Sequence, residues 1–272
     1  METYYLEKMD KPISIIDKIK KIKIEENNCK IYEKKLNQVV KKMEKREIQR
    51  VVLAKELHEN EELINLLNSK SIKIFDGRWL MKYITFEILE FILNKQNIKK
   101  EETQLAITTN DITDIVIENI KKLSKEFKRL TVVTRHIDKL KKIEEEIYEK
   151  EGILIIVSNN TKKSLARADV ILNMDFNKEM LNKYKIKEDS IIINLEGNMK
   201  IKSKRFNGIV VNDYEIKVKR RENIWKSNME KFKEKELLEA VIFRRDTYSH
   251  IRNIIKTNKI EISEIIGING KI

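Results

Sequence analysis

From Thr103 onward, the chain alternates short apolar runs with amphipathic helical patterns, and this alternation limits the folds that it can adopt. The pattern predicts strands over residues 105–108, 130–134, 152–157 and 169–172, with helices over 112–126, 137–149 and 161–167 between them. Strand–helix–strand steps of this kind require crossovers, which place neighbouring strands parallel. Apolar runs at 191–193 and 209–211 bring the sheet to about six strands, so we expect a mostly parallel, doubly wound α/β sheet.

The turn after the first of these strands lacks the glycines of a dinucleotide-binding turn. Glycines there make the tight bend, let the backbone approach the pyrophosphate and allow the helix to pack closely on the strand. The three corresponding positions hold Thr109, Asp111 and Asp114. Carboxylates at a helix N-terminus oppose a phosphate that the helix would otherwise attract. We therefore expect ordinary pyrophosphate binding to be weakened or lost. The structural alternative is that Asn110 or Asp111 simply caps the helix, and it leads to the same expectation.

The rest of the chain predicts a smaller α/β domain at the N-terminus and a helical segment at the C-terminus. The patterns indicate helices over 31–47, 61–68 and 78–95, and strands over 50–54 and 72–75. The polar stretch 94–103 is the expected boundary. We expect an N-terminal domain over 1–100, a sheet domain over 101–220, and a helical segment over 221–272 that returns to the N-terminal domain. Residues 261–272 read as a small strand or a loose tail.

Composition indicates a soluble cytoplasmic protein. No apolar run approaches the roughly 18 residues of a membrane span. The N-terminus shows no secretion signal, and the single cysteine, Cys29, cannot form an internal disulfide.

The net charge of +13 raises the question of nucleic acid. Basic clusters occur at 18–23, 202–205, 217–221 and 244–245. The excess of lysine over arginine, together with abundant isoleucine and asparagine, is also the composition expected of an AT-rich genome. A solvated basic surface is therefore the alternative to a nucleic-acid site.

Two short motifs carry a resemblance to a known group of enzymes. The second strand of the sheet ends in Thr134-Arg135, and a later strand reads Ala168-Asp-Val-Ile-Leu-Asn173. With the order of the predicted domains, these motifs resemble shikimate dehydrogenase, glutamyl-tRNA reductase and related two-domain NAD(P)-binding proteins, over roughly residues 103–212. The resemblance implies a Rossmann-like fold and would place Arg135 on the 2′-phosphate of NADP. The first hundred residues show no recognisable shikimate-binding Lys and Asp motif, so no catalytic residue is carried over.

Polar residues that follow the apolar strands form the candidate site, because ligands bind at the carboxyl ends of such strands. Besides Thr108 and Asp175, the set contains the cofactor-binding candidates Thr109, Asn110, Arg135, Ser158, Asn159 and Asn173. Ordinary loop chemistry is the alternative interpretation.

Other residues that could carry chemistry give weaker signals. The segment 76–79 reads as a helix cap with a tryptophan anchor, and Lys55 follows a buried strand. The histidines His58, His136 and His250 are far apart, and Glu62 stands where a zinc-protease motif would need its second histidine, so no metal is expected.

The leading interpretation is a divergent Rossmann-like protein that has lost ordinary dinucleotide binding and acts as a binding, regulatory or assembly protein; the sequence leans against an enzyme and leaves that question open. No cofactor is expected in that case. Its partner would be a protein or a small ligand at the carboxyl edge of the sheet, and isoleucine-rich helices could form a homodimer. The alternatives are an NADP-dependent oxidoreductase with an atypical turn and a nucleic-acid-associated basic protein.

Overall fold

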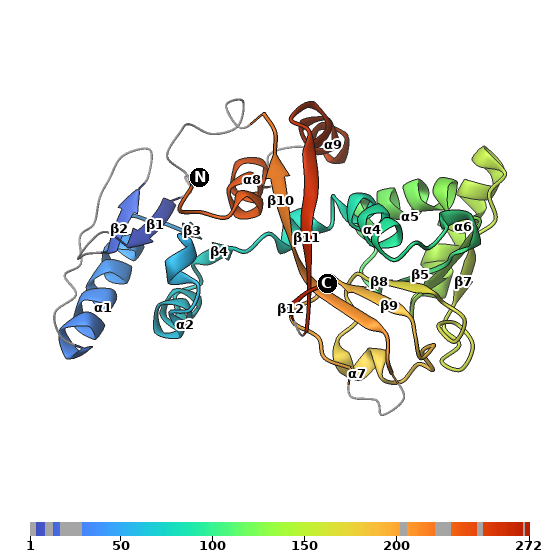
Figure 1. Ribbon diagram of the computed structural model, residues 1–272, viewed down its shortest axis with the longest axis horizontal. Helices are drawn as coiled ribbons and strands as arrows, with labels where there is room; N and C mark the ends of the chain where they lie inside the picture. Colours follow the sequence, from blue (N-terminus) through green and yellow to red (C-terminus); the bar gives the residue numbers. More distant parts are fainter. Residues whose placement is uncertain are drawn as a thin grey trace. The chain divides into compact units, whose positions relative to one another are not determined.

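The computed structural model describes residues 4–8, 13–16, 29–201, 206–220, 230–243, 247–268 and 270–272, with side chains described from Leu36 onward. The chain divides into two compact units (Figure 1). Unit 1 comprises Met1–Leu80 and Val218–Asp246, and unit 2 comprises Met81–Lys217 and Thr247–Ile272. These bounds differ from the expected ranges 1–100, 101–220 and 221–272, because the C-terminal segment contributes to both units.

Unit 1 contains a four-stranded sheet in the order β2-β1-β3-β4. The strands are β1 (Tyr4–Lys8), β2 (Ile13–Ile16), β3 (Arg50–Leu53) and β4 (Lys73–Phe75). β3 is parallel to both β1 and β4, whereas β2 is antiparallel to β1. The predicted strands at 50–54 and 72–75 are confirmed to within one residue at each end.

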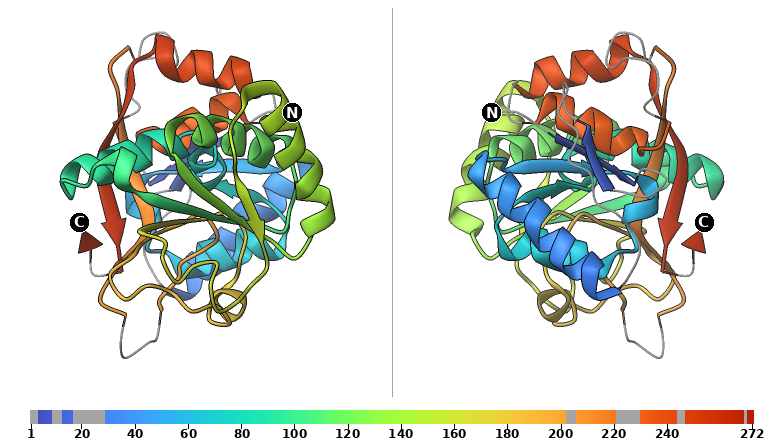
Figure 2. Two further views of the ribbon diagram at one scale, coloured as in Figure 1. Left: turned by 90° about the vertical axis from the view of Figure 1, so that its right-hand side faces the viewer. Right: turned by 90° about the vertical axis from the view of Figure 1, so that its left-hand side faces the viewer.

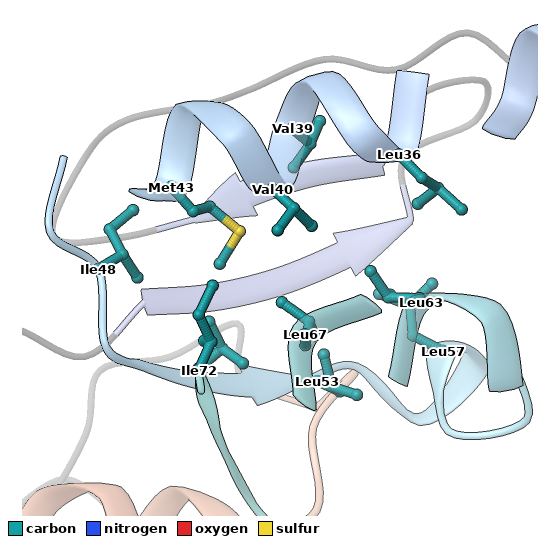
Figure 3. Packing of buried hydrophobic residues seen from close by; sticks show 11 residues of the cluster. Leu36, Val39, Val40, Met43, Ile48, Leu53, Leu57, Leu63, Leu67 and Ile72 are labelled. Carbon is teal, nitrogen blue, oxygen red and sulfur yellow. The ribbon is translucent and has the colours of Figure 1, made fainter. Parts of the chain in front are cut away.

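Two helices cover one side of the β3 region and form a core with it. The helix α1 (Cys29–Lys45) contributes Leu36, Val39, Val40 and Met43, which recur at helical spacing and are buried. Leu63 and Leu67 of α2 (Glu61–Ser69) meet them, as Figure 3 shows. Full burial of a side chain of this size contributes about 1.5–3 kcal/mol, so this cluster accounts for much of the stability of the N-terminal part.

The second core of unit 1 joins segments that are far apart in the sequence. The helix α8 (Glu234–Ile242) packs on β3 and β4. Phe232, Leu237 and Phe243 of this segment lie in one cluster with Phe75. The rings of Phe75 and Phe243 meet edge to face, with centroids 5.1 Å apart. The C-terminal segment therefore completes the core of unit 1.

Unit 2 contains an eight-stranded sheet in the order β12-β11-β10-β9-β8-β5-β6-β7. Its strands are β5 (Gln104–Thr108), β6 (Arg129–Val133), β7 (Ile156–Ser158), β8 (Val170–Asn173), β9 (Ile191–Asn194), β10 (Ile209–Val218), β11 (Ile260–Gly267) and β12 (Gly270–Lys271). The six strands β5, β6, β7, β8, β9 and β10 are parallel to one another, and β11 and β12 are antiparallel to each other. The predicted doubly wound, mostly parallel sheet is confirmed, with the reversal of strand order between β5 and β8.

Helices lie on both sides of this sheet. The helices α4 (Thr85–Lys95), α5 (Asp114–Glu126) and α6 (Ile137–Glu151) lie on one side, and the short α7 (Lys178–Leu181) lies on the other (Figures 1 and 2). The helix α9 (Tyr248–Thr257) is tied to α4, since Arg252 donates hydrogen bonds to Glu87 and to the Tyr83 carbonyl oxygen.

The structure corrects three of the predicted elements. The predicted helix over 161–167 is a series of turns, because Asn160 Oδ1 accepts the N–H groups of Lys162 and Lys163 and holds them in a turn. The predicted helix over 78–95 is divided into α3 (Arg78–Met81) and α4. The predicted strand over 152–157 begins only at Ile156, because Gly152 ends α6 in the left-handed region, at φ 68°.

The C-terminal region also departs from a continuous helix. Helical structure over 221–258 is limited to α8 and α9 within the described residues, and 221–229 and 244–246 lie outside them. The last residues form β11 and β12 at the edge of the large sheet, in agreement with the expected small strand.

Candidate functional site

The carboxyl ends of β5 and β8 define the candidate site, because strand order reverses between these two strands. Ligands of doubly wound sheets bind at this point, beyond the carboxyl ends of the strands. Thr108 ends β5 and pairs in register with Asn173, which ends β8. Both side chains are fully buried, so the residues that reach this edge are held by the sheet itself.

A row of buried polar side chains crosses four neighbouring strands at this edge. The Thr108 hydroxyl donates to Asn173 Oδ1 at 2.6 Å, and Asn173 Nδ2 donates to Asn194 Oδ1 at 2.8 Å. Asn194 Nδ2 in turn lies 3.1 Å from Asn212 Oδ1. Asn173 also accepts the N–H of Phe176 and donates to its carbonyl oxygen. Because its amide is engaged on both sides, this row shapes the edge of the sheet rather than offering free groups to a ligand.

Asp175 follows β8, and its carboxylate binds the turn that follows β5. The N–H of Asn110 lies 2.8 Å from both carboxylate oxygens, and the N–H of Asp111 lies 2.6 Å from Oδ2. The Thr109 hydroxyl lies 3.1 Å from Oδ2 and 2.9 Å from the Asp111 carbonyl oxygen, so its single proton can serve either acceptor. Consecutive N–H groups that converge on one anion form the kind of cradle that holds phosphate in nucleotide-binding turns. Here a carboxylate of the chain itself occupies the cradle.

The same turn is linked to the end of β6. Asn110 Oδ1 accepts the N–H of Arg135 at 3.1 Å, which joins the ends of β5 and β6. The Arg135 side chain is exposed and makes no ion pair within the described part of the chain. Its positive charge acts on Tyr184, whose pKa burial nevertheless raises above the ordinary value. Arg135 therefore lies beside the candidate site with its guanidinium available.

Ser158 and Asn159 lie at the end of β7 and serve a different contact. The Ser158 hydroxyl shares a hydrogen bond of 2.8 Å with Ser164 and accepts the N–H of Asn160. Asn159 is exposed. The structure thus brings Thr108, Thr109, Asn110, Asn173 and Asp175 together, with Arg135 adjacent, while Ser158 and Asn159 belong to the neighbouring turn.

The start of α5 differs from the sequence expectation. Neither Asn110 nor Asp111 caps the helix, so that prediction is wrong; the cap position is Thr113, whose side chain makes no capping hydrogen bond. Asn110 is committed to Arg135, and Asp111 contributes its backbone N–H to Asp175. Asp114 does lie in the first turn, as expected. The anion that the sequence analysis expected from the turn itself comes instead from Asp175.

Two carboxyl groups of α8 are buried in unit 1, and the sequence analysis did not single them out. Glu236 is 1% exposed, and burial raises its pKa although His58 Nε2 lies 3.1 Å away. Glu239 is fully buried, and burial is the main reason that its pKa rises to about 8, with the charge of Asp76 adding to the effect. The N–H groups of Gly77 and Trp79 oppose that rise. Only the burial pattern of α8, which requires the fold, reveals these groups.

The other candidates of the sequence analysis have structural partners. Asp76 Oδ1 accepts the N–H of Arg78, and Trp79 packs edge-on against Phe243. Lys55 Nζ donates to the Glu230 carbonyl oxygen at 2.9 Å.

Most of the predicted basic clusters lie outside the residues that the structure describes. The basic clusters 18–23, 202–205 and 244–245 lie there, as does Arg221 of the cluster 217–221. Within the described ranges, no group of three His, Cys, Asp or Glu side chains could hold a metal ion, and no helix has the length and hydropathy to cross a bilayer.

Comparisons with known proteins give matches to solved structures alone: no family model and no curated protein matches the chain. Shikimate 5-dehydrogenase from Listeria monocytogenes, solved with shikimate and NAD, is 11% identical with a TM-score of 0.34 over 82% of each chain. Hetero-hexameric glutamate dehydrogenase from Thermus thermophilus is 8% identical with a TM-score of 0.36, over 85% of this chain and 61% of that one.

L-tryptophan dehydrogenase from Nostoc punctiforme is 9% identical with a TM-score of 0.33, over 59% of this chain and 46% of that one. The chain spans about half the length of this and several other solved structures that it matches. These likenesses concern the fold alone. The strand order of unit 2 itself establishes a Rossmann-like α/β fold.

Proposed function

We propose that the protein is a binding, regulatory or assembly protein built on a dehydrogenase-type scaffold that no longer binds a dinucleotide in the ordinary way. One observation carries this proposal: the Asp175 carboxylate accepts the N–H groups of Asn110 and Asp111 at the turn where a pyrophosphate would bind.

An incoming phosphate would have to displace that carboxylate, and the displacement costs free energy in two ways. Hydrogen bonds from N–H groups to a charged acceptor contribute about 1.5–3 kcal/mol each. A phosphate would also approach the negative charges of Asp175 and Asp111, and like charges about 4 Å apart near a protein surface repel by about 4 kcal/mol. Both effects favour the turn with the Asp175 carboxylate bound in it, here called the closed turn, over a turn that binds pyrophosphate.

The alternative is an NADP-dependent oxidoreductase, and Arg135 is the observation that favours it. Its exposed guanidinium follows β6, where it could bind a 2′-phosphate by paired hydrogen bonds. This alternative requires that the Asp175 carboxylate leave the turn when the cofactor arrives.

Calorimetric titration with NADPH, NADP and NAD at low salt separates the two functions. We expect no binding heat from the unaltered protein. Asp175→Ala removes the internal anion and leaves the N–H groups of Asn110 and Asp111 open, so this variant should gain binding of NADP or of inorganic pyrophosphate in the millimolar range or tighter.

Two variants complete the design. Asp189→Ala removes an exposed aspartate just before β9, at the amino end of the strands, and should gain nothing. Micromolar binding of NADPH by the unaltered protein that disappears in Arg135→Ala would replace the proposal with the oxidoreductase.

A further inference from the structure

A groove in unit 2 lies on the helical side of the large sheet, away from the strand ends described above. It has a volume of about 850 Å³ and is lined by α5, by α9 and by the start of β11, with single residues from α4 and α6. Pockets of about 300–1,000 Å³ are typical of sites for small molecules and cofactors. The groove is therefore of a size that can hold a nucleotide.

Basic side chains outnumber acidic ones in the lining. Six cationic residues from two helices and the segment after α9 face the groove: Lys121, Lys122, Lys125, Arg252, Lys256 and Lys259. Three of them are balanced by carboxylates. Lys121 pairs with Glu146 at 3.3 Å, Lys125 pairs with Glu151 at 2.9 Å, and Arg252 holds Glu87 with two hydrogen bonds.

The other three cations, Lys122, Lys256 and Lys259, make no ion pair with any described residue. Lys122 is half-buried, and its ammonium nitrogen lies 4.1 Å from the centre of the Phe86 ring. Burial lowers its pKa and outweighs the opposing charge of Glu87, so the net effect of the surroundings disfavours the charge. An anion beside Lys122 would remove this disadvantage.

The carboxylates of the groove limit what can enter it. Glu87 and Glu151 are already paired with cations, while Glu118 and Glu261 also line the groove. A ligand must therefore place its negative charge near the three lysines and keep it away from these glutamates. That requirement favours a compact charged group on a larger molecule.

The remaining lining residues suit the uncharged part of such a molecule. Ile255, Ile260 and the ring of Tyr248 contribute apolar surface. The Tyr248 hydroxyl is buried and has no hydrogen-bond partner among the described residues; burial raises its pKa to about 12, so it stays a neutral donor. A ligand acceptor that reaches this hydroxyl would satisfy it.

We propose that this α5–α9 groove is a binding site for a small ligand that carries a polyphosphate, with Lys122, Lys256 and Lys259 as its phosphate contacts. The volume favours a nucleotide-sized molecule over an extended nucleic acid strand. The proposal is independent of the closed turn at Asp175, since the groove shares no residue with it.

The test is calorimetric titration of the full chain with ATP, inorganic triphosphate and adenosine at low salt. ATP and triphosphate should bind, and adenosine should bind much more weakly. The variant Lys122→Met/Lys256→Gln should weaken ATP binding by about tenfold or more for each charge removed, since a charge-assisted hydrogen bond of about 1.5 kcal/mol corresponds to a factor of ten.

A control variant and a second test variant keep the outcome decisive. Lys139→Gln/Lys141→Gln removes two exposed lysines of α6 and should leave ATP binding unchanged. Lys256→Gln/Lys259→Gln changes exposed residues alone and serves if the change at Lys122 disturbs folding. Absence of ATP and triphosphate binding, equal loss in the α6 control, or preference for a single-stranded oligonucleotide over ATP would each overturn the proposal.

Discussion

Glu239 is a fully buried carboxyl group, and its surroundings make the neutral form the stable one at neutral pH. Burial raises its pKa from an ordinary value of 4.5 to about 8. The folded protein therefore retains a proton that the unfolded chain releases above pH 4.5. This contribution to stability is fully present below pH 4.5 and is lost as the pH rises through 8, at about 1.4 kcal/mol per pH unit at most.

Glu239→Gln should flatten this pH dependence. Glutamine keeps the shape of the neutral acid and carries no charge, so the variant should be more stable than the parent at pH 8 and similar at pH 5. Urea unfolding at a series of pH values, followed by tryptophan fluorescence, measures the difference. Glu62→Gln, at an exposed position of α2, is the matched control and should change nothing. If the dependence of the unfolding free energy on pH is the same in Glu239→Gln as in the parent, another group causes it, and Glu236 is the first to examine.

Asn173 is the residue on which the polar row at the candidate site depends. Asn173→Ala leaves the Thr108 hydroxyl and the Asn194 amide without their partner and opens the hydrogen bonds to Phe176. We expect a loss of about 3 kcal/mol in the free energy of unfolding, from the buried groups left unsatisfied. Asn159→Ala, at an exposed position, should cost less than about 0.5 kcal/mol in the same urea titration. Equal effects would show that the row contributes little.

At the scale of elements, the absent helix over 161–167 has a consequence for its neighbour β7. In parallel pairing, Ile156 lies beside Thr131 and shares its face of the sheet. Among the residues that the structure describes, no crossover helix covers that face there, and Leu154 and Ile156 are 68% and 57% exposed. An edge strand with exposed apolar side chains promotes self-association.

Ile156→Lys should therefore reduce self-association at high concentration and change stability by less than about 0.5 kcal/mol, because the side chain is already in water. Light scattering and urea unfolding together test this. Ile155→Lys is the contrasting variant, since Ile155 is 1% exposed and a lysine there should destabilise unit 2 strongly. Light scattering that does not change in Ile156→Lys would remove β7 as the contact that a homodimer could use.

The sequence predicts strands and helices of unit 2 well where each has a strong local pattern. The pattern over 137–149, for example, corresponds to α6 over Ile137–Glu151. The prediction fails where the structure depends on a side chain that binds backbone groups. Asn160 holds the residues next to it in a turn, and Asp175 binds a turn that lies some 65 residues earlier in the chain. Local composition identified the polar strand ends of the site, but their partners depend on strand order.

At the scale of the whole molecule, the last part of the chain is shared between the two units. Phe232, Leu237 and Phe243 belong to the core around Phe75 in unit 1. The helix α9 and the strands β11 and β12 belong to unit 2.

A chain that ends after Lys217 should therefore lose cooperative unfolding in both units, although it retains α1 and the six parallel strands almost complete. Binding of an apolar dye and the loss of a sharp urea transition would show this. Ending the chain after Gly267 removes residues 268–272, in which β12 lies, and should preserve both transitions. Cooperative unfolding of a 1–217 fragment would mean that the cores of both units are stable without the C-terminal segment.

The route of the chain also sets an order of events during synthesis. Unit 1 begins at the N-terminus but receives α8 only after residues 81–217 of unit 2 have been synthesised. Domains tend to fold as they emerge, so the parallel strands of unit 2 can assemble while the apolar surface around Phe75 is still uncovered by α8. At about 5–20 residues per second, that interval lasts on the order of ten seconds, during which a newly made chain depends on chaperones or on dilution to stay unaggregated.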